Sequence, residues 1–138
     1  MGMKNIITVG IDTNVFIYYF QQHPQFGHKA KNVFQSVTRG EIRAITSIIT
    51  LIELLSLGGS DKDIEKLKTI YLQTPNLKTF DITQSISIEA ARIRRNYGYR
   101  IPDSIQLATS LYAKASVFIT NDKRLQSFKE IKIRLLKD

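Results

Sequence analysis

Short apolar runs rich in β-branched residues alternate along this chain with longer segments of helical periodicity. The runs cover residues 6–11, 42–46, 77–80, 117–120 and 131–136. The first of them lacks strict alternation of polar and apolar side chains, which is typical of a strand buried on both faces in a parallel sheet. Strands that alternate with helices indicate β–α–β units. We therefore expect an α/β fold, with a mainly parallel sheet inside a three-layer α/β/α sandwich.

Helical periodicity predicts helices over residues 15–20, 28–38, 47–57, 61–73, 83–97, 102–114 and 124–128. Gly40 and Gly98 follow two of these segments, and Pro102 suits the first turn of another. The chain has 138 residues, with no repeat, linker or low-complexity stretch, which is the length of one domain. We expect residues 1–138 to form a single domain.

Basic residues outnumber acidic ones, with 20 Lys and Arg against 12 Asp and Glu and a net charge of +8. Such a charge attracts phosphate-rich partners without specifying a fold. The absence of cysteine excludes a disulfide scaffold, a thiolate zinc site and a cysteine nucleophile. No apolar run approaches the ~20 residues that cross a bilayer, and the N-terminus lacks the apolar length of a signal peptide. We expect a cytoplasmic protein with no membrane partner.

Two aspartates directly follow predicted strands, Asp12 after residues 6–11 and Asp122 after residues 117–120. Each can cap the helix behind it, and for Asp12 taken alone that interpretation is the better one. The carboxyl ends of parallel strands, however, share one edge of a sheet, where α/β folds bind ligands. Two aspartates at that edge are stronger evidence for a site than either one alone.

Two further carboxylates lie in predicted helices. Glu53 stands in residues 48–55, which are otherwise apolar nearly all round, and burying its charge there is costly without a cation or donors. Thr50 and Ser47 add hydroxyls to the same face, so we favour a functional cavity over a buried Lys or Arg partner or partial exposure. Asp103 opens a helix after Pro102, where Asp also commonly stabilises the helix dipole.

A cluster of three or four carboxylates can offset its own repulsion by binding hard divalent cations. Mg²⁺ prefers oxygen ligands and keeps several waters, so few protein ligands suffice. Such ions activate water and stabilise the leaving oxygen in phosphodiester cleavage without histidine or cysteine ligands. The chain has only 2 histidines, His23 and His28, and we expect neither to be catalytic.

Four motifs, in this order along the chain, resemble those of the PIN domain family. They are Asp12-Thr13-Asn14 after an apolar strand, Ser47-x-x-Thr50-x-x-Glu53 on a helix, Pro102-Asp103 opening a helix, and Thr120-Asn121-Asp122 after a strand. The likeness extends from Ile6 to about Leu125 and is greatest to the VapC-type toxin ribonucleases of prokaryotic toxin–antitoxin pairs.

The resemblance implies an α/β/α sandwich around a parallel sheet of about five strands. It also implies Mg²⁺- or Mn²⁺-dependent endoribonuclease activity, a homodimer, and a protein antitoxin as partner. Asp12 and Asp103 match the principal metal ligands, and Glu53 and Asp122 complete the acidic pocket. The polar residues expected to orient carboxylates or water are Thr13, Asn14, Thr120 and Asn121.

The densest basic stretch, residues 92–100, leads straight to Asp103. Arginine planes and tyrosine rings suit stacking on unpaired bases and charge contacts to phosphate. We expect Tyr97 to pack in the core and the RNA-binding side chains to be Arg95, Tyr99, Arg100, Lys123 and Arg124. Such a basic rim offsets the repulsion between RNA and the four acids.

The sequence leaves open a toxin endoribonuclease, a PIN-like RNA-processing nuclease without an antitoxin, and a catalytically inactive RNA-binding domain. Retention of all four acids argues against the third. A phosphotransfer receiver domain needs paired acids after its first strand, which Asp12-Thr13 does not supply. The toxin hypothesis also predicts an exposed apolar groove for the antitoxin. The apolar surface near Glu53 could serve the antitoxin, a dimer interface or neither, and its residues are Leu51, Leu54, Leu55 and Leu57.

Overall fold

The computed structural model describes residues 5–136 as alternating strands and helices. In chain order the elements are β1 (Thr8–Ile11), α1 (Thr13–Phe20), α2 (Gly27–Thr38), β2 (Arg43–Ser47), α3 (Ile48–Leu55), α4 (Asp61–Leu72), β3 (Leu77–Phe80), α5 (Gln84–Tyr97), α6 (Ile101–Tyr112), β4 (Val117–Thr120), the 3₁₀ helix η1 (Lys123–Ser127) and β5 (Lys132–Leu135). Every strand and helix predicted from the sequence is present, with the last helical segment forming a 3₁₀ helix.

The five strands form one parallel sheet in the order β3-β2-β1-β4-β5. β1 lies in the centre, where Gly10 pairs with Ile45 of β2 and with Phe118 of β4. The edge position predicted for the last strand is confirmed. Ile6 and Ile7, predicted to belong to the first strand, precede it and are exposed because the ladder with β2 begins at Thr8.

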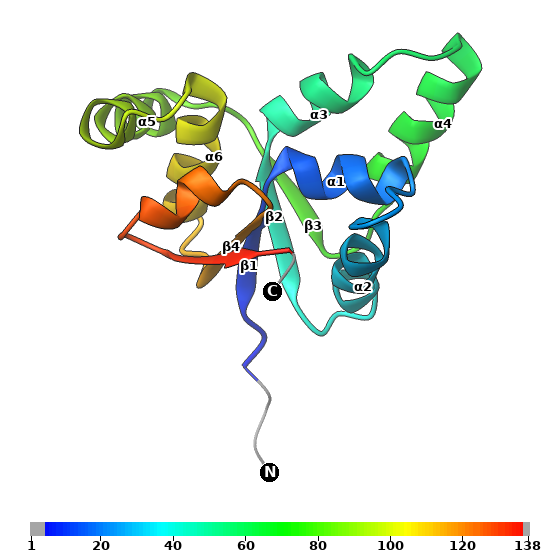
Figure 1. The fold of residues 1–138 in the computed structure, drawn as a ribbon, viewed down its shortest axis with the longest axis horizontal. Coiled ribbons are helices and arrows are strands. Elements are labelled where there is room, and N and C mark those ends of the chain that lie inside the picture. Colours follow the sequence, from blue (N-terminus) through cyan, green and yellow to red (C-terminus); the bar gives the residue numbers. More distant parts are fainter. Residues whose placement is uncertain (1–4, 137–138) are drawn as a thin grey trace.

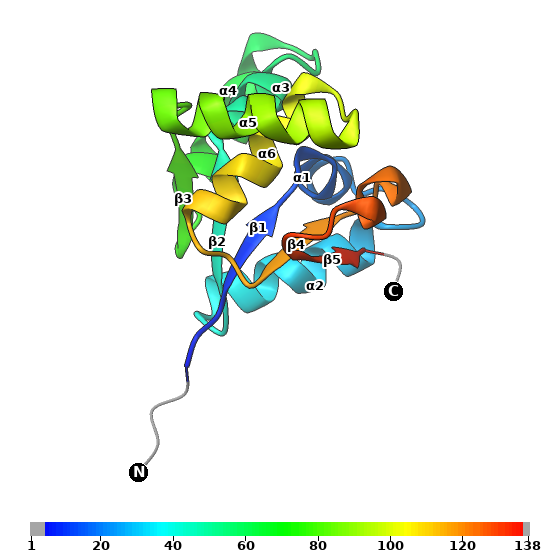
Figure 2. The same ribbon diagram turned by 90° about the vertical axis from the view of Figure 1, so that its left-hand side faces the viewer.

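Helices cover both faces of the sheet, as Figures 1 and 2 show. On one face α1 and α2, with α3 and α4 beyond them, bury a core that includes Phe16, Phe34 and Ile119. On the other face α5 and α6 bury a second core around Leu107 and Phe118. Two apolar cores separated by a parallel sheet confirm the predicted α/β/α sandwich.

Helix α6 packs unusually close to β1 at Gly10. A Cβ atom added there would lie 2.0 Å from Ser110 Oγ and 2.9 Å from Phe118 Cδ1, so only glycine fits. Asp103 and Gln106 lie on the same helix as Ser110. The contact at Gly10 therefore sets how near the sheet these two side chains lie.

Helix α3 is less buried than its composition predicts. Thr50 and Leu54 are buried, Leu51 is partly buried, and Ile52 and Leu57 are exposed. The prediction that Leu54 contributes to an exposed groove is wrong, because this side chain packs fully into the core with Phe16 and its neighbours. Across residues 5–136, no helix has the length and apolarity to span a membrane.

Candidate active site

The four predicted acids line one pocket at the carboxyl edge of the sheet. Because the strands are parallel, the ends of β1 and β4 carry Asp12 and Asp122 to the same edge. Helices α3 and α6 add Glu53 and Asp103 from the two helical layers. The pocket has a volume of about 200 Å³, and its lining is Asp12, Thr13, Asn14, Ile17, Glu53, Arg100, Pro102, Asp103 and Asp122.

Asp12 is a buried carboxylate held by neutral donors. It is 6% exposed, and it caps α1 by accepting a hydrogen bond from the Thr13 backbone N–H at 2.9 Å. Its Oδ2 accepts a hydrogen bond from the Thr120 hydroxyl at 2.7 Å. Burial raises the pKa of Asp12 to about 7, with the charges of Asp103 and Glu53 acting in the same direction and the bonds from Thr120 and Thr13 against it. A nearby cation would favour its ionised form.

Glu53 is half-buried and also held by a hydroxyl group. Its Oε1 accepts a hydrogen bond from Thr13 Oγ1 at 2.7 Å. Among the ion pairs within residues 5–136, none involves Glu53 or Asp12. We call Asp12 and Glu53 the hydroxyl-bound pair, since hydroxyl groups hold their carboxylates where no basic side chain does.

Asp103 and Asp122 form the arginine-bound pair. Arg124 Nη2 donates to Asp103 Oδ2 at 3.2 Å and also to Asp122 Oδ2. Arg100 Nε donates to Asp103 Oδ2 at 3.3 Å, and its Nη2 lies 4.0 Å from Asp122 Oδ2. The hydrogen bond from Arg124 lowers the pKa of Asp122. Two side chains predicted to contact RNA thus pair with the acids of the pocket.

Thr120 connects the two pairs. Besides donating to Asp12, its hydroxyl oxygen accepts hydrogen bonds from the Asp122 backbone N–H at 3.1 Å and from Asn14 Nδ2 at 3.2 Å. Asn121 donates through its backbone to Asn14 Oδ1 at 3.2 Å, and its side chain lies 3.4 Å from the Tyr18 hydroxyl. Within residues 5–136 the Asn121 side chain forms no hydrogen bond to an acid, unlike Thr13, Asn14 and Thr120.

A buried polar network extends from Thr13 into the core. Gln106, only 2% exposed, donates through Nε2 to Thr50 Oγ1 at 2.7 Å and to Thr13 Oγ1 at 3.3 Å. The Thr50 hydroxyl lies 2.7 Å from that of Thr46. Neither Gln106 nor Thr46 was predicted to belong to the site. The available signal for Gln106 was its spacing, since it follows Asp103 by one helical turn and lies on the same face of α6.

Tyr99 is not available for stacking on a base, contrary to the prediction. It is 4% exposed, its hydroxyl lies 2.6 Å from Ser127 Oγ, and its ring stacks on Tyr97 at 5.4 Å. Gly98 ends α5 in the left-handed conformation at φ 76°, and the chain beyond it turns Tyr99 inward. Tyr97, predicted to lie in the core, is only partly buried and donates to Glu130 at 2.9 Å.

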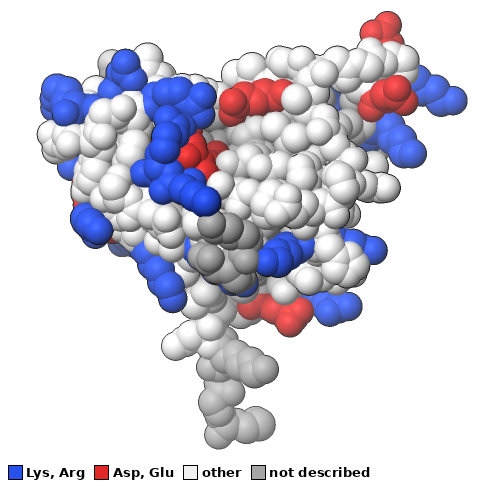
Figure 3. All heavy atoms as spheres, in the orientation of Figure 1, with Lys and Arg blue, Asp and Glu red and all other residues white. Residues whose placement is uncertain are grey.

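The remaining predicted RNA-binding residues are exposed. Arg95 lies in the last turn of α5, and Lys123 follows Asp122 at the start of η1. Figure 3 shows Lys and Arg side chains gathered beside a group of acidic ones on one face of the molecule. Positive charge therefore borders acidic charge on this face, as expected for a basic rim.

The donor types of the pocket suit a hard divalent cation, although the arrangement does not yet match one. Within residues 5–136, no three His, Asp or Glu side chains are grouped so that they could hold a metal ion. Carboxylate oxygens are nevertheless among the ligands that Mg²⁺ and Mn²⁺ prefer. Arg100 and Arg124 already pair with carboxylate oxygens of Asp103 and Asp122. These guanidinium groups would compete with a cation for the two aspartates.

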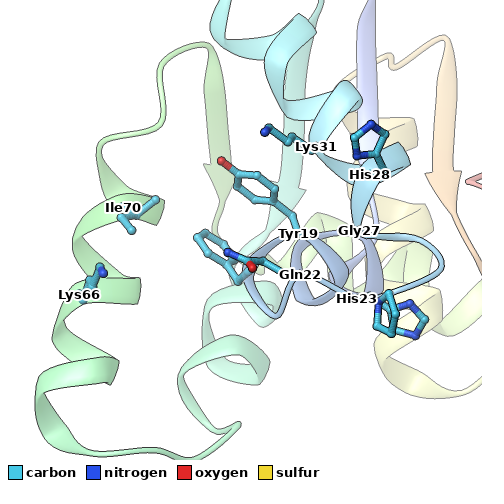
Figure 4. A pocket seen from close by; sticks show the side chains of 10 residues that line it. Tyr19, Gln22, His23, Gly27, His28, Lys31, Lys66 and Ile70 are labelled. Atoms are coloured by element: carbon cyan, nitrogen blue, oxygen red, sulfur yellow. The ribbon is translucent and has the colours of Figure 1, made fainter.

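A separate cavity of about 720 Å³ opens between α1, α2 and α4. Figure 4 shows Lys66 and Ile70 on α4 across from Tyr19 on α1. His23 Nδ1 accepts hydrogen bonds from two backbone N–H groups of the turn before α2, at 3.1 Å each. The cavity is lined by Tyr19, Phe20, Gln22, His23, Pro24, Gly27, His28, Lys31, Lys66 and Ile70.

Comparison with protein families and solved structures is consistent with this geometry. Residues 9–131 match the model of the PIN domain. No curated protein has significant sequence similarity to the chain. VapBC2 from Rickettsia felis, bound to a DNA fragment from its promoter, is similar with a TM-score of 0.75 at 15% identity, over 94% of this chain and 98% of that one.

Two further solved structures share the fold. DNA-bound VapBC from Salmonella typhimurium has a TM-score of 0.71 at 20% identity, over 95% of this chain and 99% of that one. VapBC-5 from Mycobacterium tuberculosis, a member of a family of toxin–antitoxin systems, has a TM-score of 0.59 at 16% identity, over 96% of this chain and 99% of that one. At these low sequence identities, the TM-scores show a shared fold alone.

Proposed function

We propose that this chain, which belongs to the PIN domain family, is a metal-dependent endoribonuclease and the toxin of a VapC-type toxin–antitoxin pair. The observation that carries the proposal is the convergence of Asp12, Glu53, Asp103 and Asp122 on one small pocket at the carboxyl edge of the sheet. Four carboxylates brought together from four elements are costly unless cations compensate them. An RNA nuclease of this kind acts in the cytoplasm.

In this proposal Asp12 and Asp103 are the principal ligands of Mg²⁺ or Mn²⁺, and Glu53 and Asp122 complete the pocket. The ion, when bound, supplies a water of lowered pKa and stabilises charge on the scissile phosphate. The hydroxyls of Thr120 and Thr13 orient the carboxylates of Asp12 and Glu53 for that task. Burial raises the pKa of Asp12 to about 7, so a cation held in the pocket would favour its ionised form.

Arg100 and Arg124 have two roles in the proposal. In the free protein they neutralise Asp103 and Asp122. If those aspartates held a cation, the same guanidinium groups would be free to pair with RNA phosphates beside the pocket. Arg95 and Lys123 extend the positive rim that guides RNA to the acids. The net charge of +8 favours the same encounter.

The protein partners in the proposal are an antitoxin and a second copy of the chain. The cavity between α1, α2 and α4, with the exposed Ile70 in its lining, supports antitoxin binding on that side. Relatives of the same fold are toxin–antitoxin complexes. The exposed Ile88 and Ile101 on α5 and α6 support a dimer interface on the opposite layer.

Cleavage of single-stranded and hairpin RNA tests the proposal, with Mg²⁺, Mn²⁺ or EDTA and with Asp12→Asn and Asp103→Ala as variants. We expect cleavage that requires a divalent cation and is lost in both variants. Cleavage that resists EDTA, or that both variants retain in full, contradicts the metal-carboxylate mechanism. RNA binding without cleavage by the unmodified protein would instead support an inactive RNA-binding domain.

Co-expression with the product of a small reading frame directly upstream, if it encodes a DNA-binding protein, tests the toxin assignment. We expect the two proteins to co-purify and the complex to cleave RNA more slowly than the free chain. A chain that stays fully active in the presence of that product would be an RNA-processing nuclease without an antitoxin.

A further inference from the structure

Gln106 is buried in the core, yet it lies two hydrogen bonds from a carboxylate of the pocket. Its Nε2 donates to Thr13 Oγ1 at 3.3 Å, and Thr13 Oγ1 donates to Glu53 Oε1 at 2.7 Å. We infer that Gln106 is a positioning residue, which acts through Thr13 to hold the Glu53 carboxylate in the pocket. The inference rests on the proposed function for its consequence in cleavage, although its geometry stands independently.

The orientation of the Gln106 amide follows from a single backbone group. The Ser47 N–H, which can only donate, lies 3.2 Å from the Gln106 carbonyl oxygen Oε1. With Oε1 facing Ser47, the Nε2 end must face Thr50 and Thr13. An amide nitrogen can only donate, so both threonine oxygens accept from it.

The remaining protons of the network follow from this orientation. The Thr46 hydroxyl donates to the carbonyl oxygen of Ile11 at 2.8 Å, so its oxygen is left to accept from Thr50 at 2.7 Å. Thr13 accepts from Gln106 and has one proton to give. That proton goes to the charged carboxylate of Glu53, because a hydrogen bond to an ionised acceptor is the stronger one. In this assignment the Thr13 and Thr50 oxygens, 3.0 Å apart, share no proton, and the Thr46 hydroxyl also lies 3.3 Å from Gln106 Oε1.

This hydrogen-bond chain bears on the relative positions of Glu53 and Asp103 in the pocket. Glu53 has a long side chain, and Thr13 is the hydrogen-bond donor to it among residues 5–136. Gln106 lies on α6, the same helix that carries Asp103. Helix α6 therefore supplies one acid of the pocket directly and fixes another through Thr13, which places Glu53 and Asp103 in a constant relation.

Four variants test this inference. Gln106→Leu removes both donors, Gln106→Glu keeps the size and the acceptor for Ser47 but removes the amide donor, and Thr13→Val removes the relay. The fourth combines Gln106→Leu with Thr13→Val. The control is Thr109→Val, since Thr109 is buried on the same helix and donates only to the Ile105 carbonyl oxygen at 2.7 Å.

Mn²⁺ affinity by calorimetry and RNA cleavage kinetics are measured for each protein, and the NMR signals of the Gln106 side-chain amide are measured for the unmodified protein, Thr13→Val and Thr109→Val. We expect each single variant at Gln106 or Thr13 to lower Mn²⁺ affinity and kcat by about tenfold, as is common for residues that orient metal ligands. KM for RNA should stay within about twofold, because a buried side chain cannot touch the substrate. The Thr109→Val control should keep both values.

The double variant separates positioning from packing. If Gln106 acts through Thr13, the double variant binds Mn²⁺ no more weakly than Thr13→Val alone. Independent packing defects would instead multiply, and that result would overturn the inference. The Gln106 amide signals should also shift in Thr13→Val without any metal, and unchanged signals contradict the inference even if the unmodified protein neither binds Mn²⁺ nor cleaves RNA. Failure of the proposed function is thereby distinguished from failure of the positioning role.

Discussion

The hydroxyl-bound pair and the arginine-bound pair face the same pocket but are stabilised in opposite ways. Asp12 and Glu53 accept hydrogen bonds from neutral hydroxyl and amide groups, and the charge on Asp12 is disfavoured by burial. Asp103 and Asp122 are neutralised by guanidinium groups of the chain itself. One half of the pocket therefore has uncompensated negative charge, and the other has its own counter-ions.

This difference indicates how a cation would be accommodated. Binding near Asp12 and Glu53 relieves a cost that burial has already imposed, because neutral donors leave the carboxylate charge in place. Binding near Asp103 and Asp122 requires two arginines to leave first. The hydroxyl-bound pair should therefore provide the driving force, and the arginine-bound pair should limit the affinity.

The largest expected effect is the loss of cleavage when the hydroxyl-bound pair is changed. Asp12→Asn should lower kcat/KM for RNA by more than about 100-fold, because even residues that only orient metal ligands contribute about 10- to 100-fold. Asp122→Asn should cost about tenfold, since Asp122 only completes the pocket. Single-turnover cleavage measures both, and equal losses would remove the distinction between Asp12 as a principal ligand and Asp122 as a residue that completes the pocket.

In the absence of metal, substituting Asn for Asp12 and for Asp122 should change the free energy of unfolding in opposite directions. The folded-state pKa of Asp12 is about 7, above the unfolded value of 3.8, so its ionisation destabilises the fold progressively from about pH 4 to pH 7. Asp12→Asn keeps an acceptor for Thr13 and should raise the free energy of unfolding at pH 8 in EDTA by about 2 kcal/mol. The gain should vanish near pH 4.

Asp122→Asn is the matched comparison, since the pKa of Asp122 is lowered in the folded state by Arg124. Its ionised form stabilises the fold above the unfolded pKa and loses that contribution as the pH falls. The substitution should therefore cost up to about 1 kcal/mol at pH 8, because the arginine pair is partly exposed. Urea unfolding at both pH values measures the two variants, and changes of the same sign would contradict the comparison.

Removing an arginine should strengthen metal binding while it weakens RNA binding. Arg124→Gln removes a competitor for Asp103 and Asp122, so the affinity for Mn²⁺ should rise about fivefold, corresponding to an exposed ion pair of ~1 kcal/mol. Lys62→Gln is the control, since it changes the net charge equally on the distant helix α4. Calorimetry that finds equal or weaker binding in Arg124→Gln would show that the arginines do not compete with the ion.

The smallest expected effect is on the rim outside both pairs. Lys123→Gln should raise KM for RNA about twofold and leave kcat and Mn²⁺ affinity unchanged, since an exposed phosphate contact contributes mainly to electrostatic attraction. The difference from the unmodified protein should shrink as NaCl is increased. A fall in kcat would mean that Lys123 belongs to the pocket.

The element order and the four acids of the pocket could be predicted because each depends on local pattern. Apolar runs mark the strands, and parallel strands bring Asp12 and Asp122 to one edge whatever the details of packing. The environment of Tyr97 and Tyr99 could not be predicted in this way. Gly98 turns the chain between them, so that Tyr99 is buried while Tyr97 is only partly buried against the same core, which helical periodicity cannot reveal.

Gln106 and the pairing of Arg100 and Arg124 were beyond prediction for different reasons. A glutamine inside a helix is ordinarily exposed, and only the tertiary contact of α6 with β2 and α3 shows that it is buried. Arginine side chains are long, so their positions in the sequence indicate proximity to the acids but not which oxygens they contact. Both features depend on side-chain direction rather than on periodicity.

The close contact between Gly10 of β1 and Ser110 of α6 fixes the position of α6 relative to the sheet. Helix α6 packs directly on Gly10, which has no side chain, and the first turn of this helix carries Asp103 to the pocket. Gly10→Ala would push α6 away from the sheet at this contact and so displace both Gln106 and Asp103. Gly10 in the central strand therefore sets the distance between α6 and the sheet, and with it the position of Asp103 in the pocket.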